Sequence, residues 1–237
     1  MQSIKIIPES RDHTNLRFRL SDDRMKGERM YSYVLEFNLG MRGDDAEEYL
    51  AEAVRTWPRY WEEIPGVTRT LLLCNAFALA GNYQYKWRVD VETLSALSSI
   101  DRVMKAGDGG WREMRAKWFK ARTEARAQML QYFAGNERHL DARRGEEGAI
   151  HLVLHDPSQE SKSAEDRLRA LEGASGVVSA QALRRVLGPG QASKQIWLQL
   201  ESLDGLDGVA ASSDLAAGPG ELFGELREVD GALFAGA

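Results

Sequence analysis

The sequence predicts an α+β protein made of two consecutive halves, each with the element order β-α-β-β-α-β. Across residues 30–135, segments in which apolar and polar residues alternate are separated by segments with helical periodicity. The same order recurs across residues 149–237. Two short similarities link the halves at a nearly constant offset in the chain. These observations predict two packed units of one design.

The internal similarity is visible in the residues themselves. VDVETL at 89–94 matches LQLESL at 198–203, and the Gly-Val pair at 66–67 matches the pair at 176–177. Both offsets are close to 110 residues, and a constant offset is what a duplicated unit predicts. Chance similarity between two β-rich stretches is the alternative.

The first half opens with a strand at 30–39, in which Tyr31, Tyr33, Leu35 and Phe37 alternate with other residues. A helix is expected from Asp44, with Glu47 completing a capping box and Pro58 kinking or restarting it. A hairpin through Gly81 and Asn82 joins strands at 67–80 and 83–91. Helical spacing continues at 94–107 and 111–125, and 129–133 is expected to be the fourth strand.

The second half repeats this order after a polar, glycine-containing segment. We expect strands at 150–154, 177–187, 196–200 and 222–234, a helix at 163–171 and a poor helix within 203–218. Residues 183–186 can also be read as helical. The predicted boundaries are an N-terminal extension at 1–29, a first domain at 30–135 and a second at 149–237.

Composition excludes several classes of function. The net charge of -5 argues against a general nucleic-acid partner, because phosphate binding needs concentrated positive charge. Cys74 is the single cysteine, so an intrachain disulfide and a thiolate zinc site are excluded. The first residues do not read as a signal peptide, and the apolar run at 71–80 is too short to span a bilayer. We therefore expect a cytoplasmic protein with no membrane partner.

The segment 31–133 resembles the dimeric α/β-barrel superfamily, whose members have ferredoxin-like folds. The resemblance rests on the strand YSYVLEFNLG, a helix with aromatic residues ending in EIPGV, the hairpin at 80–82 and the junction RVDVETLSAL. NIPSNAP-like, EthD-like and antibiotic-biosynthesis-monooxygenase domains look like this. The second half resembles the superfamily more weakly.

This resemblance implies that the two ferredoxin-like halves pack their sheets face to face as an α/β barrel within one chain. It implies a small-molecule enzyme of biosynthesis, acting on a hydrophobic, oxygenated aromatic or polyketide-like substrate by acid–base chemistry or cofactor-free oxygenation. Tandem members include haem-binding chlorite dismutase-like proteins, so haem is the alternative to no cofactor. A non-catalytic binding or assembly protein and a homo-oligomer stay open.

His151 and His155 are the first candidate catalytic residues. On a strand they share one face with Val153, opposite the apolar Ile150, Leu152 and Leu154. Four residues separate them by roughly 13 Å, which is too far to bind one metal ion together. Either histidine can act as a general base or as an axial haem ligand; an edge or surface histidine is the alternative.

Polar residues also share one face of two strands in the first half. Arg88 can bind a carboxylate or enolate there, with the catalytic candidate Asp90 or Glu36 positioning a proton. Removal of the Arg88 side chain, like that of His155, is expected to spare the fold. Glu36, Asn38 and Lys86 are the predicted substrate-binding residues. Two alternatives stay open: the polar face can be solvated, or the face with Tyr83, Tyr85 and Trp87 can line the pocket.

Two further features favour structural roles. Cys74 lies in an apolar strand, where a lone cysteine is usually a small core residue. The basic residues of 112–126 are expected on a solvated helix face. No glycine loop has a nucleotide-binding spacing, which disfavours ATP and NAD.

Overall fold

The computed structural model describes residues 30–79, 81–135, 149–156, 161–189, 193–212, 219–229 and 232–235. Each half has four main strands with helices between them, as the sequence predicts. The first half contains β1 (Tyr31–Leu39), α1 (Asp44–Glu62), β2 (Val67–Asn75), β3 (Tyr85–Val91), α2 (Ala96–Ala106), α3 (Trp111–Ala121) and β4 (Arg122–Gly135). The second contains β5 (Ile150–Asp156), α4 (Ser161–Glu172), β6 (Val177–Leu187), β7 (Lys194–Leu200), α5 (Gly205–Ser212), β8 (Gly220–Val229) and β9 (Ala232–Ala235).

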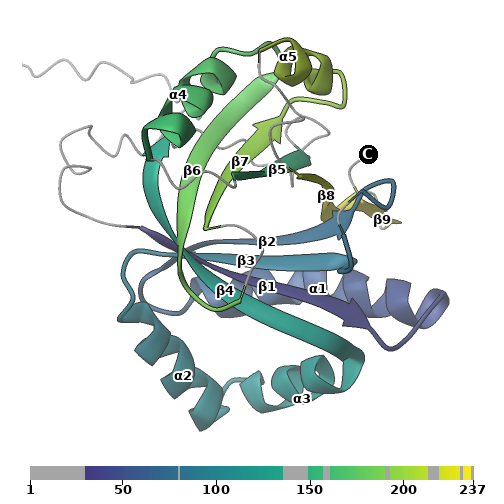
Figure 1. Ribbon diagram of the computed structural model, residues 1–237. Helices are drawn as coiled ribbons and strands as arrows, with labels where there is room; N and C mark the ends of the chain where they lie inside the picture. The colour runs from purple at the N-terminus through teal and green to yellow at the C-terminus, as the bar shows by residue number, and fades with distance from the viewer. Residues whose placement is uncertain are drawn as a thin grey trace, which may run out of the picture.

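The two four-stranded sheets join into one closed antiparallel barrel. The strand order is β2-β3-β1-β4-β6-β7-β5-β8, and β8 pairs again with β2, while β9 adds to β8. Figure 1 shows the first half below the second, with the long β4 and β6 curving across the junction. The sheets therefore form one continuous wall within a single chain.

Strand register shows how closely the halves correspond. Tyr31 pairs with Val91 in the first half, and Ile150 pairs with Leu200 in the second. Both halves carry a register shift at the same point of the second strand pair, between Val67 and Arg69 and between Val177 and Ser179. Val91 of the first half is therefore structurally equivalent to Leu200 of the second. In the same way, Asp90 is equivalent to Gln199 and Arg88 to Trp197.

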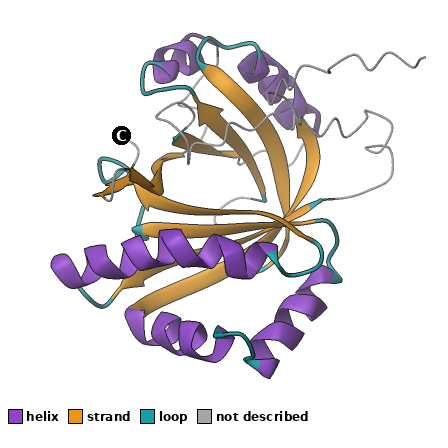
Figure 2. Ribbon diagram, turned by 180° about the vertical axis from the view of Figure 1, so that it is seen from behind, coloured by secondary structure: helices purple, strands orange, loops and turns teal. Residues whose placement is uncertain are grey.

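The helices cover only the outer face of the barrel wall, as Figure 2 shows from behind. In the first half the outer face is aromatic: Phe37, Tyr85 and Trp87 pack against Trp57 of α1 and Trp118 of α3. Aliphatic residues play this part in the second half, where β5, β6 and β7 pack against Leu168 and Leu171 of α4. Alternation along each strand leaves the polar residues facing inward. The alternative in which Tyr85 and Trp87 line the barrel interior is therefore wrong.

Several local expectations need correction. Asp44 is the first helical residue and not the cap; Gly43 occupies that position without a side-chain hydrogen bond. The helix continues through Pro58 to Glu62, supported by the burial of Trp57 and Trp61 on one face. Helix α3 ends at Ala121 because the following residues join β4, so Arg122 and Arg126 belong to a strand.

The remaining expectations for the chain divide into two groups. Residues 183–186 belong to strand β6, so their helical alternative is wrong. The extension at 1–29 and the segment 136–148 lie outside the described residues. Within the described ranges, no helix combines the length and the apolar character needed to cross a bilayer.

Candidate functional site

The barrel interior holds two clusters of buried and half-buried polar side chains with apolar residues between them. We call them the Arg88 cluster (Ser32, Arg69, Arg88, Asp90, Tyr132, His151, Gln181 and Glu225) and the Glu221 cluster (Glu36, Lys86, Arg126, His155 and Glu221). Trp197 lies between them: its ring is 4.7 Å from the Arg88 guanidinium carbon and 5.9 Å from Lys86 Nζ. Phe223 adds a second ring beneath Lys86, at 4.6 Å.

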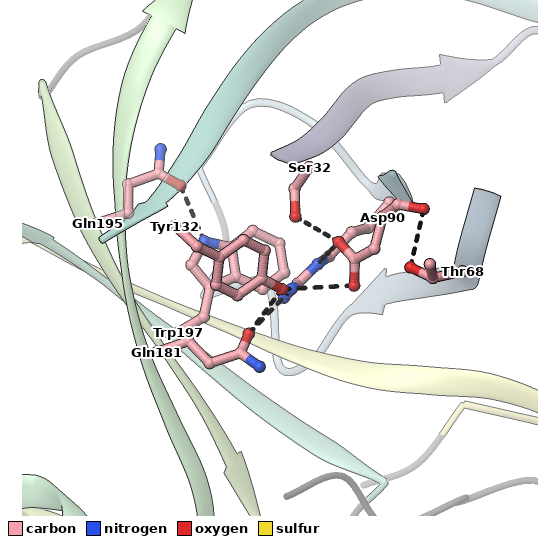
Figure 3. Close-up of polar contacts among 8 residues, drawn as sticks. Ser32, Thr68, Asp90, Tyr132, Gln181, Gln195 and Trp197 are labelled. Carbon is pink, nitrogen blue, oxygen red and sulfur yellow. Dashed lines mark hydrogen bonds and ion pairs between the residues drawn. The ribbon is translucent and has the colours of Figure 1, made fainter. Parts of the chain in front are cut away.

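The centre of the Arg88 cluster is the buried ion pair between Arg88 and Asp90. Figure 3 shows Asp90 with Ser32, Tyr132 and Gln181 around it. Arg88 Nε donates to Asp90 Oδ1 at 2.8 Å, and Arg88 Nη2 donates to Gln181 Oε1 at 2.9 Å and to the hydroxyl of Tyr132. Ser32 donates to the same Asp90 oxygen. The Tyr132 hydroxyl donates to Gln181 Oε1 at 3.0 Å. Polar groups of both halves take part in this network, so it links the first half of the chain to the second.

Burial and charge act in opposite directions on these groups. Burial raises the pKa of Asp90, but the Arg88 charge and the hydrogen bonds from Arg88 and Ser32 outweigh it, so the net pKa is lowered. Burial raises the pKa of Tyr132 to about 12, against the opposing charge of Arg88. At neutral pH the cluster therefore holds an ionised Asp90 and a protonated Tyr132.

His151 lies at the edge of the Arg88 cluster, with Nε2 3.2 Å from Glu225 Oε2. Burial lowers the His151 pKa more than its carboxylate partner raises it, so the imidazole is neutral at pH 7. A cavity of about 10 Å³ lies beside it, lined by Arg69, Arg88, Ser179, Gln181 and Gln199 among others.

The Glu221 cluster is a chain of ionic contacts nearer the other end of the barrel. Lys86 Nζ lies 3.0 Å from Glu36 Oε1 and also contacts Glu221 Oε2. His155 Nε2 is 3.0 Å from the same Glu221 oxygen, and Arg126 Nε donates to Glu36. Burial raises the pKa of Glu221, but the hydrogen bond from His155 and the charge of Lys86 hold it at about 2.

An open groove of about 580 Å³ lies directly beyond the Glu221 cluster. Three of its lining residues, Asn38, Gln84 and Glu124, lie two positions along the chain from Glu36, Lys86 and Arg126, respectively. Asn38 joins them, because its Nδ2 lies 3.2 Å from Glu124 Oε2 and its Oδ1 accepts from Gln84 N at 2.8 Å. The lining Tyr83 ring lies 4.8 Å from the Arg126 guanidinium carbon. The volume suits a small organic molecule.

The candidate site residues identified from the sequence lie in three places: the Arg88 cluster, the Glu221 cluster and the groove. Arg88, Asp90 and His151 lie in the Arg88 cluster, Glu36, Lys86 and His155 lie in the Glu221 cluster, and Asn38 lines the groove. Six of the seven are buried, which excludes the solvated-face alternative for them. Arg88 and His155 do not belong to one contact group, because the Trp197 layer lies between their clusters.

Sequence reasoning missed several members of both clusters. Glu221 follows a glycine-rich segment with no strand pattern, Arg126 was placed on a helix, and Tyr132 lies in a short run that reads as apolar. Only strand alternation on the inner face could have found Tyr132 and Glu225. Cys74 is half-buried, and burial raises the pKa of its thiol to about 11, which fits a structural role.

A haem held by either histidine does not fit the described interior. The Nε2 atoms of His151 and His155 are 3.2 Å and 3.0 Å from carboxylate oxygens. The cavity beside His151 has room for about one water molecule, far less than a porphyrin needs. In the part of the chain that the structure describes, no three His, Cys, Asp or Glu side chains gather to hold a metal ion.

Solved structures share this fold at low sequence identity. A protein of Fusobacterium nucleatum, provisionally named a monooxygenase, matches with a TM-score of 0.61 and 8% identity, covering 89% of this chain and 98% of that chain. An anthrone oxidase-like protein matches at 0.52 and 9%, covering 90% and 95%. A second provisionally named monooxygenase, from Lactobacillus acidophilus, matches at 0.50 and 10%, covering 88% and 99%. No family model and no curated protein matches the sequence.

Proposed function

We propose that this protein is an enzyme that binds a hydrophobic, oxygenated small molecule in the groove and removes a proton from it. Where dioxygen is the second substrate, the resulting enolate is oxygenated without a cofactor. The observation that carries the proposal is the chain of five titratable residues of the Glu221 cluster, one residue layer below the lining of a groove of suitable size. Charged side chains brought together below a cleft are typical of catalytic sites.

His155 is the proposed general base. Because the pKa of Glu221 is about 2, its carboxylate is ionised at neutral pH and accepts the proton on His155 Nε2. The Nδ1 atom then carries the free lone pair; it is buried and within the described residues it has no hydrogen-bond partner, so the substrate would have to reach it one layer below the groove lining. A carboxylate that fixes the tautomer of a histidine is a recurring device in proton transfer.

Lys86 and Arg126 are the proposed partners of the negative charge that develops on the substrate oxygen. Lys86 is buried, while Arg126 is partly exposed and contacts both Glu36 and the ring of the groove-lining Tyr83. Cations fixed in place beside a developing oxyanion stabilise the transition state. Asn38 and Tyr83 would position the substrate, since both line the groove.

The comparisons support this proposal only through the fold. The names of the similar structures include monooxygenases and an anthrone oxidase-like protein. Anthrone is therefore a reasonable first probe. Loss of its methylene proton gives an enolate, and reaction with O₂ gives anthraquinone and water, so that one oxygen atom enters the product and the other leaves as water.

The test is oxygen uptake and anthraquinone absorbance with anthrone as substrate. We expect turnover by the unmodified protein and a loss on the order of 100-fold in His155→Gln, because glutamine can donate to Glu221 but cannot accept the proton. The turnover of Arg126→Gln is expected to fall roughly tenfold to a hundredfold, because a charged contact to the substrate oxygen is lost. Its matched control is Arg102→Gln, an exposed arginine on α2, which should leave turnover unchanged.

Three results would contradict the proposal. Full activity in a folded His155→Gln variant would show that the base lies elsewhere. Saturable binding of anthrone and of related phenols without any turnover would favour a ligand-binding protein. A Soret band in the purified protein would favour a haem protein and would require the interior to open.

Acid stability gives a second test of the Glu221 cluster. The pKa of Glu221 is lowered from 4.5 to about 2, so its contribution to stability is complete above pH 4.5 and is lost as the pH falls toward 2. Glu221→Gln should therefore reduce the pH dependence of the free energy of unfolding in this window. Urea titrations of both proteins from pH 6 to pH 2 measure it, and parallel curves would contradict the assignment.

A further inference from the structure

The cavity inside the Arg88 cluster has a wall that is unusual for its chemistry. Arg69 from β2 and Arg88 from β3 face it from one half, and Ser179, Gln181 and Gln199 face it from the other. These residues all carry N–H or O–H groups that can donate hydrogen bonds. Among the residues that the structure describes, neither aspartate nor glutamate lines the cavity. The wall is therefore rich in donors and in positive charge.

Arg69 differs from Arg88 in having no ionic partner. Arg88 is paired with Asp90 at 2.8 Å, while Glu225 lies 3.2 Å from the neutral His151. Asp90 and Glu225 act on Arg69 through space, but within the described residues no carboxylate lies within ion-pair distance of it. A guanidinium with no carboxylate in contact has donors that an anion can engage directly.

We infer that this cavity is a binding site for one small inorganic anion of about the size of a halide. Its volume of about 10 Å³ corresponds to roughly one water molecule, so a polyatomic anion such as sulfate does not fit. Arg69 is only half-buried and reaches the surface of the barrel, which gives an anion a route inward. Arg69 is the primary cationic partner, and the amide and hydroxyl donors of the second half complete the shell.

This site is separate from the groove and does not depend on the proposed chemistry. Trp197 lies between the Glu221 cluster and Arg88. The anion would bridge the two halves of the chain, because its donors come from β2 and β3 on one side and from β6 and β7 on the other. Occupancy is therefore expected to stabilise the closed barrel.

The test is thermal unfolding in sodium chloride and in sodium gluconate at equal ionic strength. Gluconate is too large for the cavity, so it controls for general screening. We expect the melting temperature to rise saturably with chloride and to stay lower in gluconate. In Arg69→Gln the apparent Kd for chloride should weaken at least tenfold, while Arg102→Gln, with the same change of charge at an exposed position, should behave like the unmodified protein.

A direct measurement covers the case in which Arg69→Gln does not fold. Crystals of the unmodified protein grown in sodium bromide should show an anomalous peak between Arg69 and Arg88. Equal stabilisation by chloride and gluconate, an unchanged chloride response in Arg69→Gln, or no bromide peak in the cavity would each overturn the inference and leave water as the occupant.

Discussion

Trp57→Ala should lower the free energy of unfolding by about 3–5 kcal/mol, since it removes a large side chain from a closed aromatic core. Trp57 is 4% exposed. Its ring stacks on Trp118 with centroids 4.1 Å apart and meets the edge of Trp87 at 5.2 Å. For a chain of this size the loss corresponds to a fall in the melting temperature on the order of 10 °C.

The control for this substitution is Phe119→Ala. Phe119 follows Trp118 on α3 but is 59% exposed, so its removal should change the melting temperature little. Calorimetry or circular dichroism of the two variants measures the difference. Equal melting temperatures for Trp57→Ala and the unmodified protein would show that the aromatic cluster does not contribute to stability as its burial indicates.

Arg88→Met should lower the free energy of unfolding by a comparable amount, because it removes the charge partner of a buried carboxylate. Strand alternation suggested that the Arg88 side chain could be removed without harm to the fold, but the structure places it at 2% exposure with Asp90, Tyr132 and Gln181 as partners. Its loss leaves Asp90 buried without its cation, which typically costs about 3–5 kcal/mol. Urea unfolding at neutral pH is the measurement.

A double-mutant cycle separates this electrostatic cost from lost packing. Arg88→Met combined with Asp90→Leu should be less destabilised than Arg88→Met alone, because no uncompensated charge is left. The gap between Arg88→Met and the unmodified protein should also narrow in acid. The unmodified protein loses the Asp90 contribution as the pH falls through its lowered pKa, while the variant regains stability when its Asp90 is protonated. Additive changes in the free energy of unfolding in the double-mutant cycle would contradict the ion-pair explanation. So would a stability difference between Arg88→Met and the unmodified protein that does not change with pH.

The fold was predictable because local and global signals agree in this chain. The alternation at 31–37 and 85–91 predicts strands but leaves open which face meets the helices. The packing of Phe37 and Trp87 shows that the aromatic side does. The ends of the helices and strands were harder to predict from the sequence. Residues 122–128 carry basic residues at helical spacing, yet they join β4, because pairing with β1 on one side of the strand outweighs local propensity.

The site was predictable only in part, because strand alternation predicts which face a residue occupies but not its partners. It puts Arg88, Lys86 and both histidines on the polar faces of their strands, for which the cavity and bulk solvent were both open, and the structure shows them buried. The partners of these residues come from distant strands: Lys86 contacts Glu221, and Arg88 contacts Gln181. Those contacts depend on how the two sheets cross, which a single sequence pattern does not encode.

The equivalence of the two halves has a consequence for symmetry. Arg88 and Trp197 occupy equivalent positions, yet one is a cation and the other is the aromatic ring on which it rests, 4.7 Å away. A barrel assembled from two identical subunits would bring two arginines or two tryptophans together at its axis. Because both sheets belong to one polypeptide, each position can differ from its counterpart, and the interior becomes polarised along one direction. The barrel should therefore bind one organic ligand per chain, where a symmetric pair would present two equal sites.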